Sequence, residues 1–141
     1  MKMAICMLMA VLLSLAVSAC GQDTTPAEDS FTVQVLCESK GIYQLFYSCY
    51  LGDAQYSSGA MADLDGNEIT ADTDLTLVFS RSFFEESDLS RFAMDFSPYG
   101  KDDVSEIATT ERVSFAAEYG KTYTIVFSGD REQGFQATLK A

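Results

Sequence analysis

Short segments in which apolar and polar residues alternate constrain the fold of this chain more than any other feature. Successive side chains of a β-strand point to opposite faces, so alternation is typical of a strand with one face in a core. Turn residues such as Gly41, Gly52 and Gly120 separate the segments, and no long amphipathic helix interrupts them. The apolar faces consist of Phe31, Val33, Val35 and Cys37; Tyr43, Leu45, Tyr47, Cys49 and Leu51; Leu75, Leu77 and Phe79; Phe92, Met94 and Phe96; Val113, Phe115 and Ala117; Tyr123, Ile125 and Phe127; Phe135, Ala137 and Leu139.

Two weaker segments, residues 56–61 and 104–107, extend this pattern to about seven to nine short strands. A parallel sheet would need crossover connections of about a dozen residues or more, usually helices, and the chain offers none. The pattern therefore predicts an all-β domain over residues 31–141, folded as a single antiparallel β-sandwich whose sheets lie about 10 Å apart.

The last 30 residues carry a family resemblance. Val113-x-Phe115 is followed by a Gly-containing turn and by the run Tyr123-Thr124-Ile125-Val126-Phe127. This arrangement resembles the closing strands of immunoglobulin-like and fibronectin-like sandwiches. The resemblance implies an immunoglobulin-like fold in which the Tyr123 hydroxyl bonds backward to the main chain as a tyrosine corner.

The first 20 residues read as an export signal. Lys2 precedes an apolar run from Met3 to Val17, which is too short for a transmembrane helix of about 20 residues. Val17-Ser18-Ala19-Cys20 resembles the lipobox of bacterial lipoproteins. The resemblance implies that residues 1–19 are removed, that Cys20 carries a diacylglyceryl lipid, and that residues 20–30 form a flexible tether. A plain secretory cut that leaves a free Cys20 is the alternative.

This assignment predicts a protein anchored by its lipid to the extracytoplasmic face of the cell membrane, since two acyl chains suffice for stable anchoring. As a whole, the chain resembles small lipoproteins of Gram-positive gut bacteria, which implies a location and a fold but no activity.

Composition excludes several classes of function. Beyond residue 19 the chain has eight basic and 21 acidic residues, and such a surface repels nucleic acid. The absence of histidine rules out Ser-His-Asp and Cys-His catalysis. No C-x-x-C pair and no glycine-rich phosphate loop is present. We therefore expect neither an enzyme nor a cofactor, apart from the covalent lipid on Cys20.

Cys37 and Cys49 are either a disulfide or two free thiols. If Lys40-Gly41 makes a tight hairpin, the two residues lie about 16 Å apart along the strands. A disulfide needs Cα atoms within about 7 Å. We expect two buried free thiols.

Asp63, Asp65 and Asn67 follow the spacing of oxygen ligands in a calcium loop, but Glu68 stands where that loop needs glycine. A turn built on Asp65-Gly66-Asn67 explains the same residues. We expect no metal site here and keep calcium as the weaker alternative.

Tyr43, Tyr47, Tyr50 and Tyr56 form a dense aromatic group, which favours core packing or an exposed strip for a ligand. Tyr50 and Tyr56 are the candidates for a ligand surface. The sequence thus predicts a non-enzymatic surface module that binds a protein or a carbohydrate. The alternative is a structural or accessory subunit of an envelope complex, which an unpaired edge strand or a large apolar patch would favour.

Overall fold

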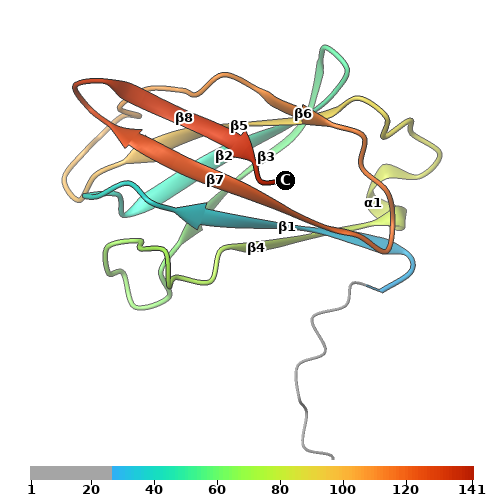
Figure 1. Cartoon of the computed structure of the whole chain (residues 1–141), viewed down its shortest axis with the longest axis horizontal. Helices are drawn as coiled ribbons and strands as arrows, with labels where there is room; N and C mark the ends of the chain where they lie inside the picture. Colours follow the sequence, from blue (N-terminus) through green and yellow to red (C-terminus); the bar gives the residue numbers. More distant parts are fainter. Residues whose placement is uncertain (1–26) are drawn as a thin grey trace, which may run out of the picture.

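Eight strands and one short helix account for the regular structure of residues 27–141, the part of the chain that the computed structural model describes (Figure 1). In chain order they are β1 (Ser30–Cys37), β2 (Gln44–Leu51), β3 (Ala54–Ala62), β4 (Thr76–Ser80), α1 (Arg81–Phe84), β5 (Phe92–Tyr99), β6 (Val113–Phe115), β7 (Thr122–Asp130) and β8 (Gly134–Leu139). The predicted signal peptide 1–19, including Val17, Ser18 and Ala19, and the lipidation site Cys20 lie outside the described residues. No helix within residues 27–141 is long and apolar enough to cross a membrane.

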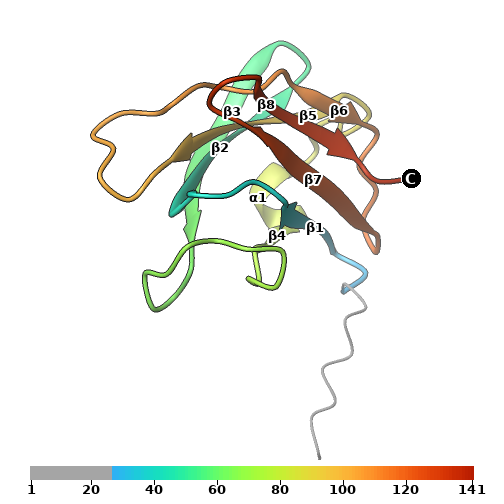
Figure 2. The same cartoon turned by 60° about the vertical axis from the view of Figure 1, so that its left-hand side comes forward.

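The strands form two four-stranded sheets that pack face to face, as Figures 1 and 2 show. The first sheet has the order β4-β1-β7-β8 and the second the order β3-β2-β5-β6. The predicted all-β sandwich is confirmed, and so is the predicted number of strands. One strand pair departs from the antiparallel prediction: β1 and β7 are parallel, with Val35 opposite Ile125. The chain crosses from β6 in the second sheet to β7 in the first, so β7 can enter in the direction of β1.

The hairpin considered at Lys40-Gly41 does not form, so the separation of about 16 Å that was argued from it does not apply. β1 lies in the first sheet and β2 in the second, so residues 38–43 cross between the sheets instead of turning back within one. The inward faces of both strands still match the alternation, because a strand buries the same face whichever neighbour it pairs with. Cys37 and Cys49 are 1% and 0% exposed and both are free, which confirms the prediction of two buried thiols.

The expected edge strand at residues 104–107 is also wrong. These residues belong to a loop between β5 and β6, in which the Val104 side chain is fully exposed. The backbone N–H of Ile107 donates to the carbonyl oxygen of Pro98 at 3.0 Å, and that of Thr110 donates to Phe96 at 2.9 Å. The loop therefore returns along the end of β5 with isolated hydrogen bonds and forms no ladder.

An aromatic cluster joins the two sheets at one end of the sandwich. Phe31 of β1 lies at its centre, with ring centroids 5.1 Å from Phe79 of β4 and 5.2 Å from Phe92 of β5. The rings of Phe84, Tyr119 and Tyr123 surround it at 5.9, 6.1 and 6.2 Å. Pairs at these separations add attraction beyond the burial of their area.

Tyr123 forms the predicted tyrosine corner. Its hydroxyl donates to the carbonyl oxygen of Ala116 at 3.1 Å and accepts from the N–H of Glu118 at 2.9 Å. Both partners precede Tyr123 in the chain, as the resemblance implied. The hydroxyl thus fixes the loop that carries the chain from β6 to β7.

Replacing the central ring tests the role of the cluster. Phe31→Ala should lower the free energy of unfolding by about 3–5 kcal/mol, because it removes a fully buried ring and leaves a cavity between the sheets. Val78→Ala is the control, since Val78 is 65% exposed on β4 and its truncation should cost less than about 0.5 kcal/mol. Denaturant unfolding measures both, and equal losses would contradict the assignment.

The buried thiols predict an alkaline loss of stability. Burial raises the pKa of Cys49 from 9.0 to about 11, although a hydrogen bond with Ser57 lowers it. A group whose pKa is raised by folding contributes stability below its unfolded pKa and loses it as pH rises through its folded pKa. The free energy of unfolding should therefore fall between pH 9 and pH 11, with about 2 kcal/mol from Cys49. Cys49→Ala should lack that component, and a parallel pH dependence in the variant would contradict the prediction.

Candidate functional site: a groove between two free sheet edges

The first and second sheets each end in an unpaired strand on the same side of the molecule. β4 is the last strand of one sheet and β3 the last strand of the other. Between them runs a groove of about 300 Å³, lined by Tyr47, Ser57, Ser58, Val78, Phe79, Ser80 and Phe83. The lining combines aromatic rings with serine hydroxyls, so the groove offers apolar contact area and polar groups together.

β3 is an edge strand without the usual protection. An unpaired edge exposes a row of backbone N–H and C=O groups, and proteins commonly block such edges with lysine, other charges or proline. The sequence of β3, AQYSSGAMA, contains no charged residue and no proline. Its side chains are small apart from those of Gln55, Tyr56 and Met61. A second extended chain can therefore approach the edge without meeting a charged side chain of β3.

Tyr56 of β3 packs against Phe83, one of the residues that line this groove. Its hydroxyl donates to the carbonyl oxygen of Phe83 in α1 at 2.7 Å. Its ring lies 5.4 Å from the ring of Phe83 and 5.1 Å from that of Phe84. Because Tyr56 is 41% and Phe83 45% exposed, each ring still presents surface to an approaching partner.

Tyr47 forms part of the groove floor from β2. Its hydroxyl oxygen would lie 2.5 Å from a Cβ atom at Gly59, so only glycine at that position of β3 leaves room for the ring. Burial, and secondarily the neighbouring Cys49, raise the pKa of Tyr47. The hydroxyl therefore stays protonated at neutral pH and can donate or accept a hydrogen bond in the groove.

The structure brings the two predicted ligand-surface tyrosines to different surroundings. Tyr50 is only 8% exposed, and its hydroxyl donates to Asp95 Oδ2 at 2.8 Å. The guanidinium of Arg112 lies 3.5 Å above its ring, so Tyr50 does not present an open ring face to solvent. Tyr56 is the exposed member of the pair. Whether either residue contacts a ligand stays a prediction.

Sequence reasoning missed the contribution of β4 and α1 to the groove. Val78 is on the outward face of an alternating segment, yet it is apolar and 65% exposed, which is the signal that could have indicated a contact surface. Phe83 precedes the fully buried Phe84. Because consecutive side chains of a helical turn point in different directions, Phe83 cannot enter the same core and stays at the surface.

The loop at residues 63–67 is organised by its own first carboxylate. Asp63 Oδ1 accepts hydrogen bonds from the N–H of Asp65 at 3.0 Å, and from the N–H and the Nδ2 group of Asn67, both at 3.1 Å. These bonds account for the alternate spacing that suggested calcium, in the manner of an Asx turn. No group of three or more Asp, Glu, Cys or His side chains within residues 27–141 is placed to hold a metal ion.

Two carboxyl groups in turns have a lowered pKa. Backbone and side-chain hydrogen bonds with Ser90 lower the pKa of Asp88, and hydrogen bonds from the Gly100 N–H and Arg131 lower that of Asp103. Asp103 Oδ2 lies 2.6 Å from Arg131 Nη2. Both carboxyls are therefore ionised at neutral pH, and their partners fix local turns.

Comparison with known proteins does not assign this chain to a family. No protein-family model matches it, and no curated protein matches it. A search of solved structures finds an NMR structure of a protein from Eubacterium rectale, with 12% identity and a TM-score of 0.40. That match covers 79% of this chain and 89% of the other.

Proposed function

We propose that this chain is a non-enzymatic binding module, held by a lipid on Cys20 at the extracytoplasmic face of a bacterial membrane, which captures an extended polypeptide along β3. The observation that carries the proposal is the uncharged nine-residue edge of β3 beside an aromatic groove. Edge strands of this kind bind peptides by strand addition, in which the main chain supplies affinity and alternate side chains supply specificity.

The groove suits this mode of binding. A strand added to β3 would extend the second sheet over the gap toward β4, and alternate side chains would point to Phe79 and Phe83. Ser57 and Ser58 also line the groove and add polar groups to its wall. A carbohydrate is the alternative ligand, since Tyr47 and Phe83 offer rings for stacking against a sugar.

A second candidate function is that of a structural or accessory subunit in an envelope complex. The exposed Val78 and Phe83 beside two free edges favour it, because permanent interfaces are more apolar than transient ones. The two functions differ in how long the complex with the partner lasts. A structural subunit should co-purify with its partner, whereas a binding module should bind and release its partner reversibly.

The tyrosine corner at Tyr123 supports the immunoglobulin-like or fibronectin-like relationship that the sequence suggested, because its hydroxyl makes the backbone contacts typical of that motif. Many cell-surface binding modules share the sandwich architecture, and they place their ligands on loops or free edges.

Blocking the β3 edge tests the binding mode. Ser58→Lys places a charge on the exposed edge and should abolish capture of the partner from envelope extract, because lysine disfavours strand addition. Gln136→Lys adds the same charge to β8, the free edge at the other end of the first sheet, and should leave capture unchanged. Pull-down with quantitative mass spectrometry measures the amount of partner captured by each variant. Equal capture by Ser58→Lys and by the unmodified chain would contradict the proposal.

The anchor has a separate test. Mass spectrometry of the N-terminal peptide should find Cys20 as the first residue with a diacylglyceryl group, and the protein should partition into the detergent phase of membrane extracts. Cys20→Ser should move the protein to the aqueous phase while leaving the groove intact. An unmodified Cys20 in the membrane-associated protein would contradict the lipid anchor. That result would not bear on binding at the β3 edge.

A further inference from the structure

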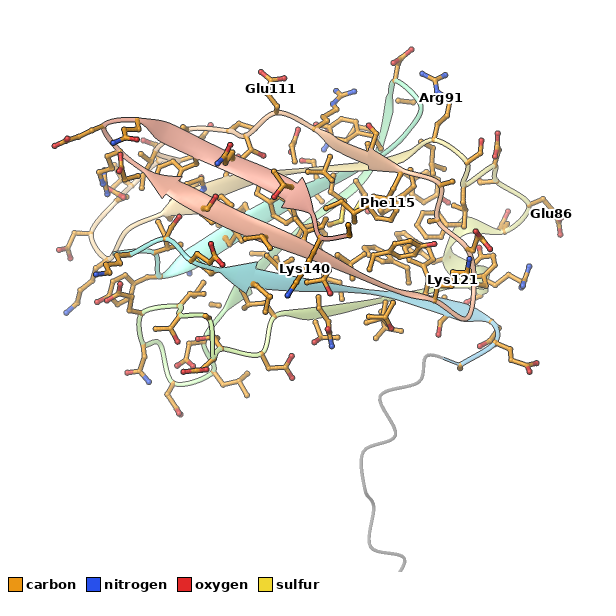
Figure 3. All side chains as sticks on the ribbon, in the orientation of Figure 1. Glu86, Arg91, Glu111, Phe115, Lys121 and Lys140 are labelled. Atoms are coloured by element: carbon orange, nitrogen blue, oxygen red, sulfur yellow. The ribbon has the colours of Figure 1, made fainter. Side chains whose placement is uncertain are left out.

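A second hollow, of about 340 Å³, lies near the start of β5 and over β6. It shares no lining residue with the groove between β3 and β4. Two arginines, Arg91 and Arg112, line it, and the small side chains of Ala93 and Ser114 sit opposite each other on adjacent strands of its wall. Figure 3 labels Arg91 and Phe115, which lie on the β6 side of the molecule.

Arg112 is held in place without a carboxylate partner. Its guanidinium stacks 3.5 Å above the ring of Tyr50, and Tyr50 is fixed in turn by its hydrogen bond to the buried Asp95. No carboxylate within residues 27–141 forms an ion pair with Arg112. A guanidinium stacked on a ring keeps its N–H donors in the plane free, so Arg112 can donate to a ligand while it remains oriented.

Arg91 approaches the same hollow from the other side. Its guanidinium lies 3.4 Å from the position that a Cβ atom would take at Gly52, whose φ of +62° also favours glycine. Its ion pair with Asp53 is long, at 3.6 Å, and both side chains are largely exposed. An exposed pair of this length contributes little, so Asp53 competes weakly for the guanidinium. By contrast, Arg131 is bound to Asp103 at 2.6 Å.

The charge of the whole chain makes this hollow distinctive. The chain has 21 acidic and only nine basic residues, yet two of its four arginines line one hollow. Ser114 adds a hydroxyl donor there, Ser90 and Phe115 complete the wall, and the Asp53 carboxylate also lines the hollow. Planar guanidinium groups match carboxylate and phosphate oxygens, and pairs of such bonds are among the stronger hydrogen bonds of proteins.

We infer that the hollow between Arg91 and Arg112 is a binding site for a compact oxyanion, the carboxylate or phosphate group of a small ligand. Arg112 donates from its stacked position, Arg91 swings from Asp53 to the oxyanion, and the Ser114 hydroxyl completes the donor set. The site is independent of the β3 edge, so a ligand here and a polypeptide in the groove can bind at the same time.

The test is titration of the full-length chain in a non-ionic detergent with sodium phosphate, sodium sulfate and sodium acetate, at constant ionic strength set by sodium chloride. Nitrogen-15 NMR follows the side-chain Nε–Hε signals of the four arginines. We expect saturable shifts at Arg91 and Arg112 and none at Arg81 and Arg131. The anion that binds most tightly identifies the preferred group. Absence of saturable shifts with all three anions, or equal shifts at all four arginines, would overturn the inference.

Variants separate a site from a general effect of charge. Arg112→Gln and Arg91→Gln should each weaken binding of the preferred anion by about tenfold or more, since each removes a charged donor. Arg131→Gln removes the same charge at the ion pair with Asp103 and should leave the dissociation constant unchanged. Arg112→Lys keeps the charge but loses the parallel N–H donors of the planar guanidinium. It should bind the anion more weakly than the unmodified chain. If Arg112→Gln does not fold, the exposed Arg91 still gives the answer, and an unaltered dissociation constant in Arg91→Gln would refute the site.

Discussion

The packing of aromatic rings around Phe31 is the interaction on which the rest of the structure depends. Phe31 belongs to the first sheet and Phe92 to the second, and their edge-to-face contact at 5.2 Å joins the two layers. Phe84 of α1 and Tyr119 of the β6–β7 loop pack on the same ring, at 5.9 and 6.1 Å. No disulfide links Cys37 and Cys49. Dense ring packing of this kind holds two sheets together through buried area and favourable ring geometry.

Each candidate site includes a residue that packs against this aromatic cluster. Phe79 contacts Phe31 on one side and forms the floor of the β3–β4 groove on the other. Phe92 contacts Phe115, with ring centroids 5.3 Å apart, and Phe115 lines the hollow of the two arginines. The core therefore presents the groove on strands and a short helix, which position side chains more accurately than free loops do, whereas Arg91 and Arg112 of the hollow lie in the segments just before β5 and β6. The cluster couples stability to the shape of both surfaces.

The sequence predicted which face of each strand is buried better than it predicted which strands pair with each other. Alternation placed Val33, Val35 and Ile125 in the core, because burial depends on a side chain's own face of the strand. It could not show that β1 pairs with β7, since a parallel partner far along the chain leaves no local signal. The supposed hairpin between β1 and β2 failed for the same reason: a turn at Gly41 is compatible with a reversal or with a crossing between sheets.

The candidate sites show the same limit. The tyrosine corner was predictable because Tyr123 and its partner Ala116 lie within one short stretch of sequence. The burial of Tyr50 was not, because its cover, Arg112, lies just before β6 and is distant from Tyr50 in the chain. The spacing of Asp63, Asp65 and Asn67 is local, and a local turn was among the readings that it favoured. The groove needs β3, β4 and α1 together, so only the assembled fold reveals it.

The acidity of the chain disfavours self-association through the unprotected edge of β3. Asp53 precedes β3 and Asp63 follows it, and Asp53 is 95% exposed. If two copies paired antiparallel along β3, the start of each strand would face the end of the other, and these carboxylates would be opposed. Like charges directly opposite each other destabilise strand pairing, and the net charge of −12 adds repulsion at longer range. An extended partner with a neutral centre and basic flanks would meet attraction at the same positions where a second copy of this chain would meet repulsion.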